Sequence, residues 1–356
     1  MTMKKILIPL LLILALVLGA CDAARASFTP TAGQVAGNPT PTPFLPMTSI
    51  EDAGIKTASL GSDVAQEAPL TGGDEVSGPV WGRFAAPSQD SDIELQPPAP
   101  LINQPEDQIT ILVMGSDLRP NTGGYRTDVM MLVVLDRTDK SVSLVSFPRD
   151  LYVYQPGYKI DRINSAQARA GWETTADTLE YNFGVRPDHY ILVHFNGFKT
   201  LVDALGGIDV QVGRTITDER DGPGDFTVHA GTVHMDGDTA LWYVRARGTS
   251  SDFDRTRRQQ EVIQAIFYRL LSLDAITNAS NLYEQYKNTV QTDLGLIDIL
   301  PLLPFASTIG NSGAIERYAV GADMVTLTRN SIGASILIPD FDKILPMMAQ
   351  ALNEPQ

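Results

Sequence analysis

Arginine, aspartate or both recur in five short segments of this chain, although the chain as a whole has a formal net charge of −15. Arginine presents a planar, permanently charged fork that fits phosphate oxygens, and aspartate presents the hard oxygens that Mg²⁺ prefers. Their combination is what a metal-bound diphosphate requires. The segments are GSD at 115–117, RTD at 126–128, PRD at 148–150, RAR at 245–247 and DRTRRQQ at 254–260.

The last segment lies at the start of a helix that we expect over residues 252–273, because apolar residues follow a helical repeat from Ile263 onward. Arg255 and Gln259 are four residues apart, so they share one face and should point inward. Arginine is disfavoured at a helix amino terminus, and a bound anion would relieve the conflict. The alternative is a solvated basic turn neutralised by Asp252 and Asp254.

Each of the other segments also has a structural interpretation. Asp117 could form a turn, and Arg126 with Asp128 could form a cross-strand salt bridge, since their i, i+2 spacing places both on one side of a strand. Arg149 could help to cap the segment after it. Arg245 and Arg247 would share a face only in extended backbone, where both could contact one phosphate group.

The elements around these segments alternate between strands and helices, which predicts the α/β class. Strands are expected at 109–114, 129–135 and 142–147, the first two buried on both faces. The motif residues lie at the ends of these strands, where ligands tend to collect in such sheets. Further helices are expected at 163–170, 174–181, 197–205 and 236–245, and further strands at 190–195 and 208–212.

The first twenty-one residues predict a bacterial lipoprotein signal. Lys4 and Lys5 precede a short apolar run, and small residues then lead into Cys21, the only cysteine of the chain. We expect Cys21 to be lipidated and to attach the protein to the outer face of the cell membrane. The alternative is an ordinary signal peptide or an uncleaved anchor.

Residues 22–108 are rich in proline, threonine, serine and alanine and lack periodic apolar stretches, so we expect a disordered linker. An acidic, proline-rich stalk would hold the following domain away from an anionic membrane surface. A purely solubilising spacer explains the composition equally well. The remaining residues are enough for one sizeable domain.

Several other functions are excluded by what the sequence lacks. The four histidines, His189, His194, His229 and His234, have no metal-protease spacing, and we interpret them as strand or loop residues. There is no phosphate-binding P-loop and no G-x-S-x-G nucleophile motif. Nucleic-acid binding is not expected, because the predicted folded part is acidic and the signal directs it out of the cytoplasm.

Read in order, the motifs resemble those of the LytR-CpsA-Psr family of bacterial envelope proteins. The matching pieces are ILVMGSDLR, YRTDVMMLV, SFPRDLYV, DRINSA, YILVHFNGF with LVDALGGIDV, ALWYVRAR and DRTRRQQ. The resemblance implies a single α/β domain with a central mixed sheet flanked by helices. It places the catalytic domain at 109–273 and, more loosely, a tail of helices and strands at 274–356 that packs on the same domain.

The resemblance implies a phosphotransferase that uses Mg²⁺ to move a phosphorylated glycan from a polyprenyl diphosphate carrier onto peptidoglycan. The family's metal-binding aspartates fall on Asp117 and Asp128, and Arg149 is grouped with them as catalytic. Which aspartate takes the proton of the attacking hydroxyl stays open. The family's diphosphate-binding residues fall on Arg126, Arg149, Arg245, Arg247, Arg255 and Gln259.

The chain departs from the family in two respects. Arg162 stands where the family commonly has lysine, which keeps the charge but changes the hydrogen-bond geometry, so Arg162 is the weakest of the diphosphate-binding candidates. Many members have an uncleaved transmembrane helix, whereas this chain carries the signature of a lipid anchor. Two other functions use the same residues: a non-catalytic binder of diphosphate lipids or cell-wall glycans, and a hydrolase with water as the acceptor.

Overall fold

The structure is a computed structural model that describes most of the chain after residue 80. The predicted signal peptide, Cys21 and most of the predicted linker lie outside the described residues. Within the described ranges, no helix has the length and apolar character needed to cross a membrane. The described residues are 81–118, 125–220, 224–247, 252–272, 287, 289–312 and 315–353.

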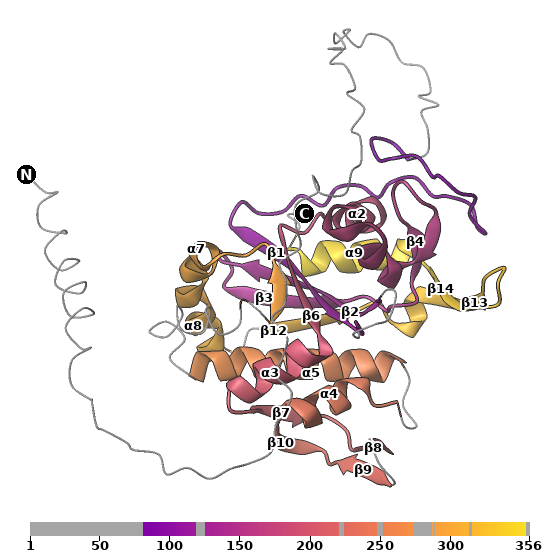
Figure 1. The fold of residues 1–356 in the computed structure, drawn as a ribbon. Coiled ribbons are helices and arrows are strands. Elements are labelled where there is room, and N and C mark those ends of the chain that lie inside the picture. Colours follow the sequence, from indigo (N-terminus) through magenta and orange to yellow (C-terminus); the bar gives the residue numbers. More distant parts are fainter. Residues whose placement is uncertain are drawn as a thin grey trace, which may run out of the picture. The chain divides into compact units, whose positions relative to one another are not determined.

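A six-stranded mixed sheet forms the centre of the domain, as expected (Figure 1). Its strand order is β11-β6-β1-β2-β3-β12. β1 pairs antiparallel with β2 and parallel with β6, while β3 pairs antiparallel with β2 and parallel with β12. The strands are β1 (Gln108–Ser116), β2 (Thr127–Asp136), β3 (Ser141–Ser146), β6 (His189–His194), β11 (Val290–Thr292) and β12 (Ile315–Ala319).

The central strands are buried on both faces, because their alternating apolar side chains enter two different cores. Leu112, Met130 and Leu132 belong to one core, whereas Met131 and Leu144 belong to the other. Continuous apolar runs are typical of strands covered on both sides. The near-continuous runs in the sequence therefore predicted the burial of β1 and β2 correctly.

Helices cover each face of the sheet (Figure 1). α2 (Ala166–Phe183) and α9 (Phe341–Ala351) contribute Leu179, Phe183, Ile344 and Met348 to the first core. α5 (Asp252–Ser272) and α8 (Leu303–Ser312) contribute to the second core through Phe267, Phe305 and Ile309, among others. The two helices expected at 163–170 and 174–181 correspond to the two parts of α2, which follows a 3-10 turn (Ile163–Ser165) and is interrupted at Gly171, where φ of 77° and ψ of −162° are not helical.

A smaller α/β layer packs on the far side of α5. Its core contains Val202, Ile208 and Tyr243, and α5 adds Val262 and Ala265 from the side opposite to Phe267. The expected helices and strand at 197–205, 208–212 and 236–245 are present, and β8, β9 and β10 were not predicted. The layer comprises α3 (Phe195–Ala204), β7 (Ile208–Val212), β8 (Ile216–Glu219), β9 (Asp225–Val228), β10 (Gly231–Met235) and α4 (Gly237–Arg245).

The C-terminal part of the chain completes the central sheet. β11 adds to the edge at β6, and β12 adds to the edge at β3. A hairpin of β13 and β14 touches the segment after β3 through a bridge between Leu151 and Leu337. The remaining elements are β4 (Tyr152–Tyr154), β5 (Ile160–Arg162), α7 (Leu296–Ile299), the 3-10 turns Leu300–Leu302 and Ala322–Met324, β13 (Val325–Arg329) and β14 (Ser335–Pro339).

Residues 81–107, which we expected to belong to the linker, are packed along the domain. The hydroxyl of Tyr154 donates to the carbonyl of Ala85 at 2.6 Å, and that of Tyr181 donates to the carbonyl of Gln96 at 2.6 Å. The high proline content hid the apolar residues that bury this segment. Those that pack against the tyrosines are Trp81, Phe84, Ile93 and Leu95.

Gly184 provides a test of how tightly this segment packs. The residue ends α2 with φ of 70°, and a Cβ there would overlap the carbonyl oxygen of Pro100. Gly333, with φ of 78°, has open space around it and serves as the control. We expect Gly333→Ala to lower the free energy of unfolding by about 1 kcal/mol through backbone strain alone.

Gly184→Ala should cost a further 1–3 kcal/mol, roughly, because the 81–107 segment must shift to accommodate the methyl group. Urea denaturation of the two variants measures this difference. Equal losses in both variants would show that the segment does not press on α2 in solution.

Candidate diphosphate-binding site

The ends of the central strands bring three of the predicted site residues to one edge of the sheet. β1, β3 and β6 run in the same direction and end at this edge, and antiparallel β2 begins there. Asp117 directly follows β1, Asp128 is the second residue of β2, and Arg149 follows β3. All three line a pocket of about 290 Å³. Sheet topology therefore explains why segments distant in the sequence meet.

α4 and the segment after it add two arginines to the same pocket. Arg245 is the last residue of α4, and the next residue, Ala246, leaves the helical conformation with φ of −51° and ψ of 136°. Arg247 then also lines the pocket, although Arg245 is helical and the two residues are not in one extended segment. The backbone N–H of Arg247 donates to Oδ2 of Asp218 at 2.5 Å, which fixes this segment.

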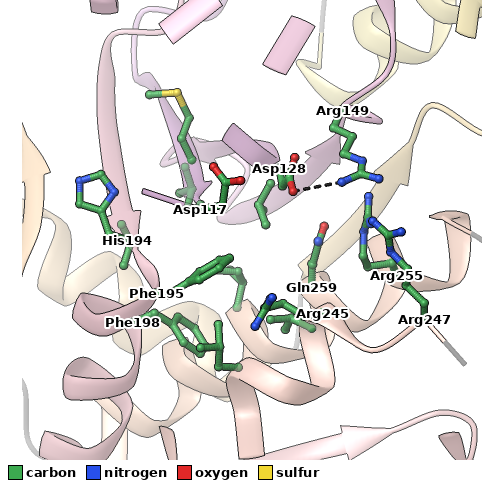
Figure 2. Close-up of a pocket in the computed structure, with 18 residues that line it drawn as sticks. Asp117, Asp128, Arg149, His194, Phe195, Phe198, Arg245, Arg247, Arg255 and Gln259 are labelled. Carbon is green, nitrogen blue, oxygen red and sulfur yellow. Dashed lines mark hydrogen bonds and ion pairs between the residues drawn. The ribbon is translucent and has the colours of Figure 1, made fainter. Parts of the chain in front are cut away.

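α5 places Arg255 and Gln259 in the pocket from one face, as their spacing predicted. Both side chains are buried, with exposed fractions of 8% and 9%. Figure 2 shows Arg255 directed toward Arg149 on the polar side of the pocket. Buried guanidinium groups so close together favour the binding of an anion.

Arg258, which the sequence interpretation did not single out, fixes the end of α4 against α5. Its side chain is 1% exposed, its Nε donates to the carbonyl of Tyr243 at 3.0 Å, and its Nη2 donates to that of Ala246 at 2.5 Å. Burial lowers the pKa of the guanidinium. By satisfying the last carbonyl groups of α4, Arg258 holds the backbone that carries Arg245 and Arg247. Its proximity to α4 could not be read from the sequence.

The pocket contains four guanidinium groups and two carboxylates. Nη1 of Arg149 lies 3.0 Å from Oδ2 of Asp128, whose other oxygen accepts from Asn164 at 3.3 Å. Oδ1 of Asp117 accepts the backbone N–H of Arg126 at 2.7 Å. The excess of positive charge in an otherwise acidic protein makes this pocket suited to a ligand with two or more negative charges.

The other side of the pocket is apolar, which restricts the ligand further. In Figure 2, Phe195 and Phe198 lie opposite Arg247 and Arg255. The guanidinium of Arg245 stacks on the ring of Phe195 at 4.5 Å and so joins the two sides. The arrangement fits an amphipathic molecule with an anionic head. The other apolar residues on the lining are Val113, Met114, Val129, Val193, Leu241, Val244 and Ile263.

Two of the candidate diphosphate-binding residues, Arg126 and Arg162, are not on the pocket lining. Arg126 is exposed just before β2, and its backbone rather than its guanidinium contacts Asp117. Arg162 ends β5, where its Nη1 lies 3.3 Å from Oδ1 of Asp150, and Asp150 in turn lies 3.4 Å from Nε of Arg149. Arg162 is therefore linked to the pocket through Asp150, which the sequence interpretation did not select.

His194, which we interpreted as an ordinary strand residue, ends β6 and lines the pocket. Its Nδ1 is hydrogen-bonded to Oγ of Ser116, which also accepts the N–H of Leu118 at 3.4 Å. Among the described residues, its Nε2 has no hydrogen-bond partner. His194 thus ties the ends of β6 and β1 together just before Asp117. The parallel pairing of these two strands, invisible in the sequence, creates this contact.

The carboxylates of the pocket fit the requirements of Mg²⁺ only when a phosphate is also present. No cluster of three or more histidine, cysteine, aspartate or glutamate residues suited to a metal occurs in the described part of the chain. Mg²⁺ is usually held by one or two carboxylates with phosphate oxygens and water. Asp117 and Asp128 supply two carboxylates beside the arginines, so this donor set is appropriate for Mg²⁺ bound together with a diphosphate.

Fold and site together define the class of protein: an α/β domain with an arginine-lined, half-apolar pocket at the edge of a mixed sheet. The model of the LytR_cpsA_psr family matches residues 84–340. The chain belongs to the LytR-CpsA-Psr family.

Named relatives are similar to this chain in sequence. The chain is 31% identical over 218 residues to the polyisoprenyl-teichoic acid–peptidoglycan teichoic acid transferase TagT of Bacillus subtilis. The aligned region covers 59% of this chain and 68% of that protein. The alignments span about two thirds of the length of such curated relatives.

Among solved structures, TagV of B. subtilis superimposes with a TM-score of 0.60 at 26% identity, over 71% of this chain and 100% of that one. A structure of TagT bound to LIIa-WTA gives a TM-score of 0.56 at 25% identity, over 70% of this chain and 91% of that one. These similarities agree with the mixed sheet and flanking helices described above.

The arginine cluster predicts binding of inorganic pyrophosphate in the presence of Mg²⁺. A ligand at one hundred times its Kd stabilises the folded state by about 2.7 kcal/mol, so thermal unfolding should shift upward. The double variant Arg245→Ala/Arg255→Ala should lose most of this shift. Arg137→Ala/Arg329→Ala removes the same charge from residues outside the pocket and should retain it; equal shifts in both variants would contradict the site.

His194 predicts an acid-sensitive contribution to stability. Burial lowers the pKa of His194 in the folded protein below its usual value of 6.5. As the pH decreases, the His194 imidazole therefore gains its proton in the unfolded chain before it does so in the folded protein. The free energy of unfolding should then fall below about pH 6.5. The His194→Asn variant should lack this pH-dependent part of the free energy of unfolding, whereas the His229→Asn variant, which replaces an exposed histidine, should keep it. Denaturant titrations at several pH values measure the free energy of unfolding of both variants.

Proposed function

We propose that this protein is a Mg²⁺-dependent phosphotransferase that moves a phosphorylated glycan from a polyprenyl diphosphate carrier onto peptidoglycan. The observation that carries the proposal is the divided pocket, with arginines and carboxylates on one side and aromatic and aliphatic side chains on the other. Relatives named as teichoic acid transferases, and a TagT structure bound to LIIa-WTA, support this class of substrate.

The arginines have the chemistry to bind the diphosphate. Arg149, Arg245, Arg247 and Arg255 approach the pocket from three different elements, so together they can contact both phosphate groups. Gln259, on the same face of α5 as Arg255, adds an amide donor. Arg162 acts indirectly, because Asp150 lies between Arg162 and Arg149. Arg126 is a weaker candidate for diphosphate binding, because it would need to reach the ligand from the exposed rim of the pocket.

The apolar side of the pocket offers a place for the first part of the prenyl chain. Phe195 and Phe198 from the start of α3, together with Ile263 of α5, form an apolar surface, which the guanidinium of Arg245 borders at Phe195. Burial of prenyl carbon there stabilises the complex through the hydrophobic effect. The polyprenyl phosphate would then leave toward this side.

The reaction transfers the glycan phosphate to a sugar hydroxyl. The hydroxyl oxygen forms a bond to the phosphorus next to the glycan, and the bond from that phosphorus to the oxygen of the polyprenyl phosphate breaks. The proton of the hydroxyl passes to one of the pocket carboxylates. The guanidinium groups stabilise the charge that develops on the departing phosphate.

Asp117 and Asp128 would hold Mg²⁺ when the diphosphate is bound. There the ion would supply charge neutralisation for the phosphate oxygens. The contacts of Asp128 with Arg149 and Asn164 keep its carboxylate oriented toward the pocket.

We further propose that Cys21 carries a lipid anchor, so that the domain works outside the cytoplasm and close to the membrane that contains its carrier. The lipoprotein signal in residues 1–21 supports this assignment.

The proposal predicts release of polyprenyl phosphate when the full-length protein, Mg²⁺, a lipid-linked glycan and peptidoglycan are combined. Asp128→Ala and Arg149→Ala should each lower kcat/KM by about 100-fold or more, because each removes a group that faces the developing charge. Mass spectrometry of the lipid products measures the release. The matched control is Arg137→Ala, at the opposite end of β2, which should keep wild-type activity.

The outcomes separate the proposed function from its alternatives. An intact diphosphate lipid after prolonged incubation would indicate a binding protein. Release that is equally fast without peptidoglycan would indicate a hydrolase. Full activity in both pocket variants would exclude this pocket as the reaction site.

A further inference from the structure

A second groove, of about 520 Å³, lies between the β8–β9 hairpin and the beginning of α5. It is separate from the diphosphate pocket, and none of the predicted site residues lines it. The groove is lined almost entirely by polar side chains. They are Arg214, Thr215, Thr217, Asp218, Glu219, Asp225, Asp254, Arg257 and Arg258, with Ile216 as the one apolar residue.

The groove and the pocket share their supporting elements. α5 presents Arg255 and Gln259 to the diphosphate pocket and presents Asp254, Arg257 and Arg258 to the groove. Asp218 lines the groove and accepts the backbone N–H of Arg247, which lines the pocket. A molecule in the groove would therefore lie next to the arginine side of the pocket.

The lining indicates a ligand rich in hydroxyl and amide groups. Its carboxylates and threonine hydroxyls can accept hydrogen bonds from sugar hydroxyls, and the more exposed arginines, Arg214 and Arg257, can donate to them. Four carboxylates accompany three arginines, so the groove lacks the positive excess that the diphosphate pocket has. A polymer with many phosphate groups would be repelled by these carboxylates.

The geometry of the reaction indicates which of the two sugar-bearing substrates, the glycan donor or the peptidoglycan acceptor, would occupy the groove. In a phosphoryl transfer, the attacking and leaving oxygens lie roughly in line. The leaving prenyl phosphate belongs on the side of Phe195 and Phe198, so the attacking hydroxyl must approach from the side of Arg247 and Arg255 (Figure 2). That is the side on which Asp218 and the groove lie.

We propose that this groove binds the acceptor, an unphosphorylated hexosamine strand of peptidoglycan, and presents its hydroxyl to the diphosphate pocket. This inference rests on the proposed function. It assigns Glu219 and Asp225, the two paired end residues of the β8–β9 hairpin, to acceptor binding. Both side chains are exposed, so their replacement should leave the fold intact.

The test compares two double variants of the full-length protein. Glu219→Ala/Asp225→Ala removes two carboxylates from the groove. Asp209→Ala/Asp238→Ala removes two carboxylates that are 66% and 68% exposed and lie outside it. The probe is a tetrasaccharide of alternating N-acetylglucosamine and N-acetylmuramic acid, and calorimetry measures its binding without any donor.

We expect the groove variant to bind the tetrasaccharide at least tenfold more weakly than the wild type, and the control variant to bind it normally. In the transfer assay, the KM for the tetrasaccharide should rise by a similar factor. Binding of farnesyl diphosphate should stay within twofold in both variants, because the diphosphate pocket is unchanged.

Three results would overturn the inference. They are equal tetrasaccharide binding by the two double variants, no binding by the wild type, and a loss of affinity for the lipid-linked donor as large as that for the tetrasaccharide. Failure of the proposed function gives a different result, since the wild type would bind the tetrasaccharide but release no polyprenyl phosphate.

Discussion

The site depends on the position of α5 between two hydrophobic cores. Ile263 and Phe267 pack toward the central sheet, whereas Val262 and Ala265 pack toward the smaller α/β layer. A helix held on two sides has little freedom to rotate about its axis. Its first turns must then direct Arg255 and Gln259 toward the edge of the sheet. The apolar packing of α5 thus determines where its charged residues lie.

The same packing makes a concentration of arginines tolerable. Arg258 is almost completely buried, but its guanidinium donates to the carbonyl groups of Tyr243 and Ala246. Arg149 is balanced by Asp128 and Asp150. Buried charges are stable only when they are paired or hydrogen-bonded, and these contacts meet that condition. The pocket still has more guanidinium groups than carboxylates, which is a property of a site that binds an anion.

The pocket draws its polar and apolar side chains from several parts of the fold. The sheet edge supplies Asp117, Asp128 and Arg149, while α3 supplies Phe195 and Phe198. The smaller layer also carries the β8–β9 hairpin and its groove, next to Arg247. Under our proposals, one domain offers neighbouring surfaces for an anionic head group, an apolar chain and a hydroxyl-rich strand.

The sequence by itself determined the α/β class, most central elements and the chemical character of the site, because apolar periodicity and residue spacing are local properties. Local spacing also predicted that Arg255 and Gln259 face inward. Only the tertiary structure decided that Arg162 reaches the pocket through Asp150, that His194 ties β6 to β1, and that residues 81–107 pack on the domain. These features depend on contacts between distant segments, which strand order and helix packing create and which no local pattern encodes.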